Sequence, residues 1–173
     1  MKTKKLVRCS LIAAVYVALC LALQPFTYGM VQVRVAEMLC LLPVFGADYI
    51  VGVTVGCFLA NLLGTMLGLT VAVDILFGTA ATLLACIFTR LLRHIRIRGL
   101  ALPAAIPPVV FNAVIVGAEL SLFFTEGALT APVVAMNMLS VALGELVSCC
   151  VLGVALVRLI ETNKRLRQLF TAA

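Results

Sequence analysis

Charged side chains are scarce in this sequence. Only 12% of its 173 residues are charged, whereas 64% are hydrophobic, and the mean hydropathy is +1.23. A soluble domain of this length needs far more polar residues to cover its surface. Apolar runs instead follow one another almost without interruption, which is typical of a chain dissolved in lipid. No polar linker is long enough to separate two domains, so we expect a single transmembrane domain over residues 1–173.

Several motifs of catalysis and cofactor binding are also absent. The sequence has no GxxxxGK[ST] motif, and its lysines lie only near the two ends, which excludes a P-loop ATPase. The one histidine, His94, stands in a basic loop, so no His/Cys or His/Asp cluster supports a membrane-embedded enzyme. The seven cysteines show no CxxC spacing and lie inside apolar runs, which favours packing over a metal site or disulfides. We therefore expect no metal, no cofactor and no catalytic residue.

The basic residues are grouped at the edges of apolar runs. Twelve of the thirteen fall into three clusters, and Arg34 is the exception. This placement fits the positive-inside rule rather than a nucleic-acid surface, so it puts all three clusters in the cytoplasm. The clusters are Lys2, Lys4, Lys5 and Arg8; Arg90, Arg93, Arg96 and Arg98; and Arg158, Lys164, Arg165 and Arg167.

The apolar runs predict an all-α integral membrane bundle of six transmembrane helices, multi-pass in the cell membrane. A spanning helix needs about 20 apolar residues, and the second run is short for a full crossing, so a tilted or discontinuous helix is expected there. Four crossings separate the first two basic clusters and two separate the last two, so both termini are predicted to be cytoplasmic. The expected helices are Leu6–Gln24, Arg34 to the break at Pro43–Gly46, Ala47–Leu67, Val71–Arg90, Ala104–Phe124 and Pro132–Ile160.

Polar side chains that interrupt the apolar runs are the informative ones, because each charge at the bilayer centre costs about 2.5–3.5 kcal/mol. With the predicted topology, most of them gather from five helices in the outward half of the bundle. That arrangement predicts a ligand pocket open to the outside. These residues are Gln32, Arg34, Glu37, Asn61, Asp74, Asn112, Glu119, Asn137 and Glu145.

Each of these residues also has a purely structural interpretation. Arg34 could snorkel to outer headgroups, and Glu37 could pair with it one helical turn away. Asp74 could complement a helix dipole, and Glu119 could be hydrated near the surface. Glu145 is the hardest to explain structurally, because a mid-helix carboxyl must meet a ligand, a partner group or a proton. The amides of Asn61, Asn112 and Asn137 are typical of interhelical hydrogen bonds.

The first helix carries a stripe of small side chains at every fourth position. Such a stripe lets another helix approach closely, either inside this bundle or from a partner protein. The stripe consists of Ser10, Ala14, Ala18 and Ala22.

Several blocks together resemble the QueT family of substrate-binding S components of energy-coupling factor (ECF) transporters. They are VQVRVAEMLCLLPVFG, GCFLANLLG, VDILFGTAATLLA, PPVVFNAVIVGAE and ALGELV, and the similarity runs from Ala14 to Gly153. The chain departs from the family at Ala36, where a serine is expected before the glutamate, and in having no tryptophan.

The resemblance implies a compact six-helix S component that captures a queuosine precursor, a 7-deazaguanine base, from outside. It also implies docking on an ECF transmembrane coupling subunit and two cytoplasmic ATPases, which would supply the missing P-loops. The alanine-x-x-x-alanine feature of such first helices corresponds to Ala14 and Ala18 and favours the external-partner interpretation of the stripe.

The chemistry of the polar residues suits this ligand. A guanine-like edge presents a ring N–H beside an amino group, and one carboxylate can accept both. We expect Glu37, Glu119 and Glu145 to accept hydrogen bonds from the base. If the base carries an aminomethyl group, its ammonium would need a second carboxylate. Arg34 would orient Glu37 or cap the ring carbonyl, and Asp74 is a weaker candidate. The side-chain amides that we expect to hydrogen-bond to the ring carbonyl of the base are those of Gln32, Asn61 and Asn137.

Two other functions fit the same composition. An S component for another vitamin or nucleobase would have the same architecture. A small proton-coupled transporter acting as an oligomer would use Glu145 as its titrating group and would transport without partner subunits.

Overall fold

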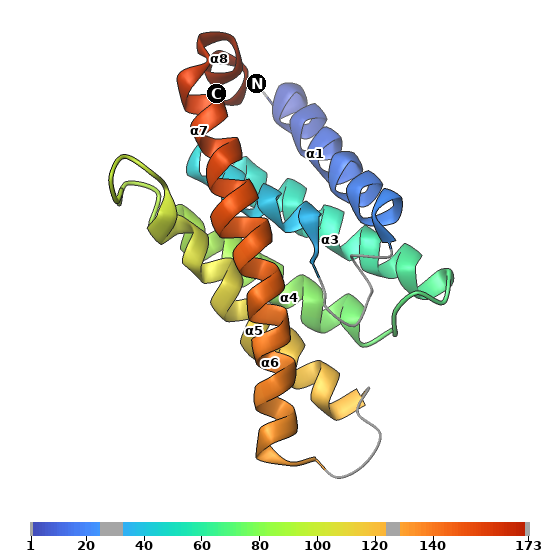
Figure 1. Cartoon of the computed structure of the whole chain (residues 1–173). Coiled ribbons are helices and arrows are strands. Elements are labelled where there is room, and N and C mark those ends of the chain that lie inside the picture. Colours follow the sequence, from blue (N-terminus) through green and yellow to red (C-terminus); the bar gives the residue numbers. More distant parts are fainter. Residues whose placement is uncertain (1, 25–32, 124–128, 172–173) are drawn as a thin grey trace.

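The structure, a computed structural model, describes residues 2–24, 33–123 and 129–171, and it contains helices and no strands within them. Figure 1 shows the helices gathered into one bundle. η1 is a 3₁₀-helix, and η2 is a π-helical segment inside the long helix formed by α6, η2 and α7. The elements are α1 (Lys2–Ala22), η1 (Val35–Val44), α3 (Asp48–Met66), α4 (Asp74–Leu91), α5 (Leu102–Phe123), α6 (Ala131–Glu145), η2 (Leu146–Gly153), α7 (Val154–Thr162) and α8 (Lys164–Thr171).

Five helices are long and apolar enough to cross a membrane. Large apolar side chains cover their outer faces, as at Met66, Leu76 and Met136, each more than 70% exposed. A surface of this kind suits lipid rather than water. The multi-pass membrane architecture is therefore confirmed, whereas a sixth crossing stays a prediction. The five spans are Thr3–Ala22, Asp48–Met66, Asp74–Leu91, Leu102–Phe123 and Ala131–Thr162.

The short helix η1 lies at the centre of the bundle. Eight of its ten residues are buried, and it contacts α1, α3, α4, α5, η2 and α7. The flanking helices thus shield η1 from the surroundings. Pro43, one residue before the end of η1, has no backbone N–H to donate, and the helix ends at Val44, within the break predicted at Pro43–Gly46.

Two arginines mark the ends of η1 against the same neighbour, α4. Arg34, just before η1, contacts Asp74 at the start of α4, whereas Arg90 at the other end of α4 donates to the carbonyl oxygens of Pro43 (3.0 Å) and Val44 (3.1 Å). The ten residues of η1 give this 3₁₀-helix a length of about 20 Å. The stretch of α4 between Asp74 and Arg90 is about 24 Å long. η1 therefore runs parallel to α4 over most of the length of α4.

Glycines let α1 approach α3 closely. A Cβ atom at Gly56 would lie 2.7 Å from Cβ of Tyr16 and 3.0 Å from Cα of Ala13, both on α1. One turn earlier, a Cβ at Gly52 would lie 3.1 Å from Cα of Cys9. The small side chains Gly52 and Gly56 therefore set the distance between the two helices.

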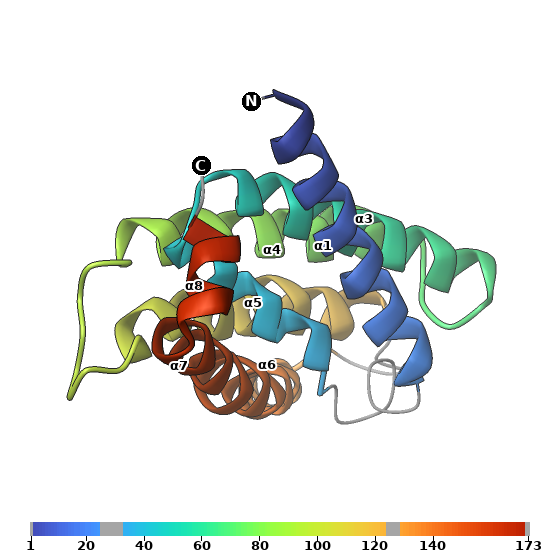
Figure 2. The same ribbon diagram turned by 90° about the horizontal axis from the view of Figure 1, so that it is seen from above.

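The chain ends in a short helix that the sequence did not reveal. Asn163 Oδ1 accepts hydrogen bonds from the backbone N–H groups of Arg165 (3.0 Å) and Leu166 (3.3 Å), which caps the start of α8. Phe170 stacks on Tyr49 with ring centroids 5.9 Å apart, and Arg8 lies over the same Tyr49 ring. The start of α1 and α8 consequently lie at one end of the bundle, at the top of Figure 1, and Figure 2 looks down on that end.

The close contact of α1 with α3 makes a prediction about stability. Because backbone and Cβ atoms of α1 occupy the space beside Gly56, Gly56→Ala should cost about 1–3 kcal/mol through overpacking and lower the Tm of the detergent-solubilised protein. Val51→Ile, which adds one carbon at an exposed position of α3, should leave the Tm unchanged. An equal or higher Tm for Gly56→Ala would contradict the close packing of these two helices.

Candidate ligand-binding site

Glu37 joins three other elements at the centre of the bundle, two through its carboxylate and one through its backbone oxygen. Its Oε1 accepts hydrogen bonds from the Tyr16 hydroxyl of α1 and from Thr82 Oγ1 of α4 (3.3 Å). Its Oε2 accepts from Cys40 Sγ at 2.8 Å, and its backbone oxygen accepts from Cys149 Sγ of η2 at 3.3 Å. Glu37 is only 1% exposed, so these donors replace the water that a carboxylate otherwise needs.

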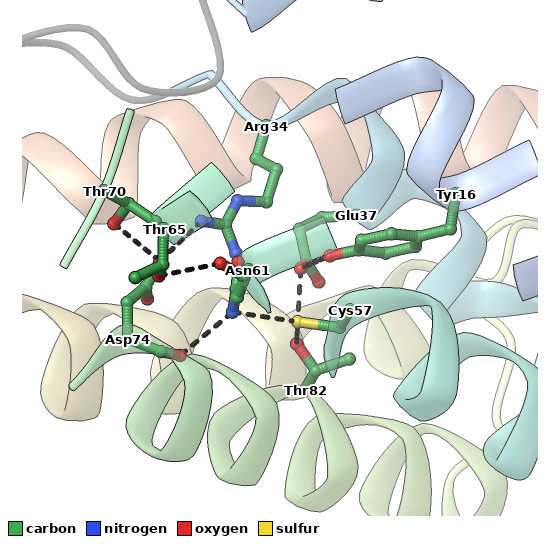
Figure 3. A network of polar contacts seen from close by, with 9 residues as sticks. All are labelled: Tyr16, Arg34, Glu37, Cys57, Asn61, Thr65, Thr70, Asp74 and Thr82. Atoms are coloured by element: carbon green, nitrogen blue, oxygen red, sulfur yellow. Dashed lines mark hydrogen bonds and ion pairs between the residues drawn. The ribbon is translucent and has the colours of Figure 1, made fainter. Parts of the chain in front are cut away.

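Arg34 and Asp74 form a buried ion pair at the other side of this network. Arg34 Nη2 lies 3.4 Å from Asp74 Oδ2, and both side chains are less than 10% exposed. Thr70 Oγ1 donates to the same Oδ2 at 3.1 Å, and Asn61 Nδ2 donates to the backbone oxygen of Asp74 at 2.9 Å. Figure 3 shows Arg34 pointing toward Asp74 while Tyr16 reaches Glu37. Arg34 is thus buried and paired, which excludes the snorkelling interpretation.

Gly78 provides the space in which Asp74 and Asn61 meet. A Cβ atom at Gly78 would lie 2.6 Å from Asp74 Oδ1 and 2.7 Å from Asn61 Nδ2. The second carboxylate oxygen, Asp74 Oδ1, and the amide oxygen, Asn61 Oδ1, are buried without a hydrogen-bond partner in the described structure. Two acceptors are therefore available at this point of the bundle.

A small cavity lies between the start of η1, α5 and α6. Its polar lining comes from Arg34, Asn112 and Glu145, and its apolar lining from Val116 and Val141. The free volume is about 10 Å³, room for about one water molecule. Glu145 is 4% exposed and accepts a hydrogen bond from Cys149 Sγ at 3.3 Å. Asn112 Nδ2 makes no hydrogen bond of good geometry within the described residues, but its amide lies within reach of the Glu145 carboxylate.

Glu119 is buried rather than hydrated. It is 2% exposed, and neither of its carboxylate oxygens has a hydrogen-bond partner within the described residues. It lies within electrostatic range of Asp74 and Arg34, on α5. A buried carboxyl with two free oxygens is unusual in a stable core, and it is the strongest indication of a ligand site in this region.

The remaining predicted site residues lie apart from this network or outside the described residues. Asn137 Nδ2 of α6 donates to Ser121 Oγ of α5 at 3.0 Å, a hydrogen bond between helices. Gln32 lies outside the residues that the structure describes. The structure therefore brings together Arg34, Glu37, Asn61, Asp74 and Glu145, with Glu119 nearby.

The small-residue stripe of α1 faces away from the bundle. Ser10, Ala14, Ala18 and Ala22 are all exposed, so the stripe does not pack inside the bundle. Its first three residues line an open groove of about 530 Å³ between α1 and α3, whose other wall includes Leu59, Leu62 and Leu63.

The predicted site residues did not include six members of the polar network, which are Tyr16, Cys40, Cys57, Thr70, Thr82 and Cys149. Tyr16, Cys57 and Thr82 lie within apolar runs and are fully buried. Thr82 Oγ1 lies 3.2 Å from Cys57 Sγ, so its one proton is shared between Cys57 and Glu37, and Cys57 Sγ also accepts from Asn61 Nδ2 at 3.6 Å. A signal for Tyr16 was present, because Ile12, Tyr16 and Cys20 recur every four residues on the face opposite the small-residue stripe.

The site as a whole is rich in hydrogen-bond acceptors. Four carboxyl groups, Glu37, Asp74, Glu119 and Glu145, share one guanidinium, that of Arg34. Within the described residues, its buried acceptors without a hydrogen-bond partner are Asp74 Oδ1, Asn61 Oδ1 and both oxygens of Glu119, and the donor Asn112 Nδ2 has only Glu145 within reach. A ligand that suits this arrangement carries several N–H donors and one acceptor.

The buried ion pair makes a second prediction. Removing one partner should cost about 3–5 kcal/mol because the other charge stays buried, whereas removing both should cost much less. Arg34→Met and Asp74→Leu alone should therefore lower the Tm more than the double variant does. The partly exposed pair Arg96–Glu161, each side chain 27% exposed, serves as the control, since Glu161→Gln should cost only about 1 kcal/mol. Additive effects at Arg34 and Asp74 would contradict their coupling.

Comparisons with known proteins identify the family. A relative, the queuosine precursor transporter QueT of Lactococcus lactis subsp. cremoris (strain MG1363), is 37% identical over 84 residues. The match covers 47% of each protein, so the chain spans about half the length of the curated relative it matches. No solved structure gives a significant match. The family described as QueT transporter matches residues 6–162, and the chain therefore belongs to the QueT transporter family.

Proposed function

We propose that this protein is the substrate-capturing S component of an ECF importer and that it binds a queuosine precursor, a 7-deazaguanine base, from outside. The matching relative carries the name of a queuosine precursor transporter, which supports the class of ligand. The observation that carries the proposal is the set of buried acceptors on Glu119, Asp74 and Asn61 that have no hydrogen-bond partner within the described residues.

The hydrogen-bonding groups of a 7-deazaguanine base complement this set. The ring N–H and the adjacent amino group offer parallel donors, which one carboxylate accepts in a bidentate pair. Glu119 has both oxygens free for such a pair. Asn112 Nδ2 then donates to the ring carbonyl, and Glu145, which lines the same cavity as Asn112, accepts from a further N–H or from an aminomethyl ammonium. Arg34 holds Asp74 in place.

Glu37 has a different role in this proposal. Both of its carboxylate oxygens already accept hydrogen bonds, from Tyr16, Thr82 and Cys40. It therefore positions η1, and with it Arg34, rather than contacting the base. This assignment differs from the sequence-based expectation, in which Glu37 accepts hydrogen bonds from the ligand.

Binding requires the cavity to widen. Its free volume is about 10 Å³, whereas ligand pockets usually have about 300–1,000 Å³. Val116 of α5 and Val141 of α6 form its apolar wall. A planar base that enters between them separates α5 from α6 and replaces their contact with its own faces. Ligand binding is thereby coupled to the position of the long helix that begins with α6.

The assembly with partner subunits rests on the surface of α1. The exposed stripe of Ser10, Ala14 and Ala18 lines a groove with an apolar wall, a surface that another helix can approach closely. The sequence has no P-loop, so ATP hydrolysis needs other subunits. We infer that an ECF transmembrane coupling subunit docks in this groove and connects the chain to two cytoplasmic ATPases.

Calorimetry on the detergent-solubilised protein tests the ligand and the pocket. A 7-deazaguanine precursor with an aminomethyl group should bind more tightly than guanine, which lacks the ammonium that Glu145 would accept, and riboflavin should bind far more weakly. Loss of a charge-assisted hydrogen bond costs about 1.5–3 kcal/mol, so Glu119→Gln and Glu145→Gln should each weaken binding about 10–100-fold. Glu161→Gln, the same change at the opposite end of the bundle, should leave the affinity unchanged.

Two results would refute parts of this proposal. If folded protein binds no deazaguanine, the proposed ligand is wrong, although the fold is unaffected. If the base binds but neither Glu119→Gln nor Glu145→Gln weakens binding, the pocket lies elsewhere.

The docking surface has its own test. Ala14→Leu and Ala18→Leu fill the groove on α1, so co-purification with the coupling subunit should fall strongly while ligand affinity is preserved. Ala80→Leu makes the same change at an exposed position of α4 and should have no effect. Equal co-purification of all three variants would exclude the groove as the docking surface. Active uptake by vesicles that contain this protein alone would favour the proton-coupled alternative.

A further inference from the structure

A second cavity lies at the opposite end of the bundle from the candidate ligand site. It has a volume of about 460 Å³ and lies between the ends of η1 and α4, the loop after α4, α7 and α8. We call it the basic pocket. The titratable side chains that line it are Arg90, Arg93, His94, Arg96, Glu161 and Arg167.

Positive charge dominates the basic pocket. Four guanidinium groups face a single carboxylate, that of Glu161, which pairs with Arg96 Nη2 at 2.6 Å. Arg90 is occupied with the carbonyl oxygens of Pro43 and Val44, and Arg93 Nη1 donates to the backbone oxygen of Arg90 at 3.1 Å. Arg96 Nη1 is buried and has no acceptor within the described residues. The pocket therefore has the charge and the donors for an anion.

The geometry of these donors suits a phosphate group. Guanidinium groups bind phosphate oxygens through paired N–H donors, and several of them can surround one tetrahedral anion. Arg93 and Arg96 come from the loop after α4, whereas Arg167 comes from α8. A phosphate between them would connect the loop to the C-terminal helix, which are far apart in the sequence.

Exposed apolar side chains also occur where the loop that supplies Arg93 and Arg96 begins and along it. Leu91, Ile95 and Ile97 each stand within two residues of a residue that lines the basic pocket, and each is more than half exposed. We call these three residues the apolar rim. Next to a phosphate, such side chains suit the acyl chains of a lipid.

We propose that the basic pocket binds the headgroup phosphate of an anionic phospholipid. Arg93, Arg96 and Arg167 hold the phosphate, and the apolar rim contacts the acyl chains. Glu161 limits the affinity, because its carboxylate competes with the phosphate for Arg96. Basic pockets between transmembrane helices on the cytoplasmic side are suited to anionic headgroups, and the clusters that supply these arginines are the ones that the positive-inside rule puts there. This inference is independent of the proposed substrate.

Native mass spectrometry on the full-length protein tests the lipid site. After equal loading with phosphatidylglycerol and phosphatidylcholine, the protein should retain phosphatidylglycerol preferentially. Arg93→Gln/Arg167→Gln should weaken this retention about thirtyfold. Arg158→Gln/Arg165→Gln removes the same charge from exposed positions outside the pocket and should retain the lipid as before. Glu161→Gln should strengthen retention, an effect that a merely structural role for the pocket would not give.

Three outcomes would overturn the proposal. Equal losses in the two double variants, with unchanged Tm values, would show an unspecific effect of net charge. Equal retention of the two lipids would show no selectivity for an anionic headgroup. Complete displacement of the lipid by millimolar inorganic phosphate would identify a site for free anions instead of lipid.

Discussion

The central constraint on this protein is a carboxylate that lies away from water. Glu37 is buried in the middle of an apolar bundle, where an unpaired charge is expensive. Its donors come from α1, α4 and η1 itself, and its backbone oxygen meets η2. Each of these elements must stand at a fixed distance from η1 to supply its hydrogen bond. The close contact of α1 with α3 at Gly56 keeps Tyr16 within reach of Glu37.

The arginines at the two ends of η1 attach this helix to α4. Arg34 fixes one end to the start of α4, and Arg90 fixes the other end through the carbonyl oxygens that Pro43 and its neighbour leave free. A 3₁₀-helix of ten residues has poorer hydrogen-bond geometry than an α-helix and is uncommon at this length. Its persistence here therefore depends on tertiary contacts, and η1 and α4 act as one unit between the candidate ligand site and the basic pocket.

The sequence was a good guide to the spans and a partial guide to the site. Hydropathy alone located five spans to within a few residues, because lipid selects for long apolar runs. The sequence also indicated the buried acidic residues, because a carboxylate in an apolar run needs a hydrogen-bond or ion-pair partner to offset the cost of leaving water. Which acid pairs with which donor was beyond the sequence. Arg34 pairs with Asp74, forty residues away, although Glu37 is closer along the chain. Tyr16, Cys57 and Thr82 look like ordinary members of apolar helices, and α8 is too short and polar for a hydropathy signal.

Within the described residues, the candidate site departs from the rule that buried polar groups are satisfied, and the proposed ligand would explain this departure. Glu37 shows that the fold can provide donors for a buried carboxylate, whereas Glu119 has none within the described residues. Local violations of such rules are expected at functional sites. A ligand with several N–H donors supplies hydrogen bonds to these acceptors and so offsets the cost of burying them. The free energy of unfolding therefore rises when the ligand binds, and it rises more for a ligand with a lower Kd. Replacing Glu119 with an apolar residue of similar size should therefore stabilise the empty protein and abolish the gain in stability on adding ligand, a combination that a purely structural carboxyl would not produce.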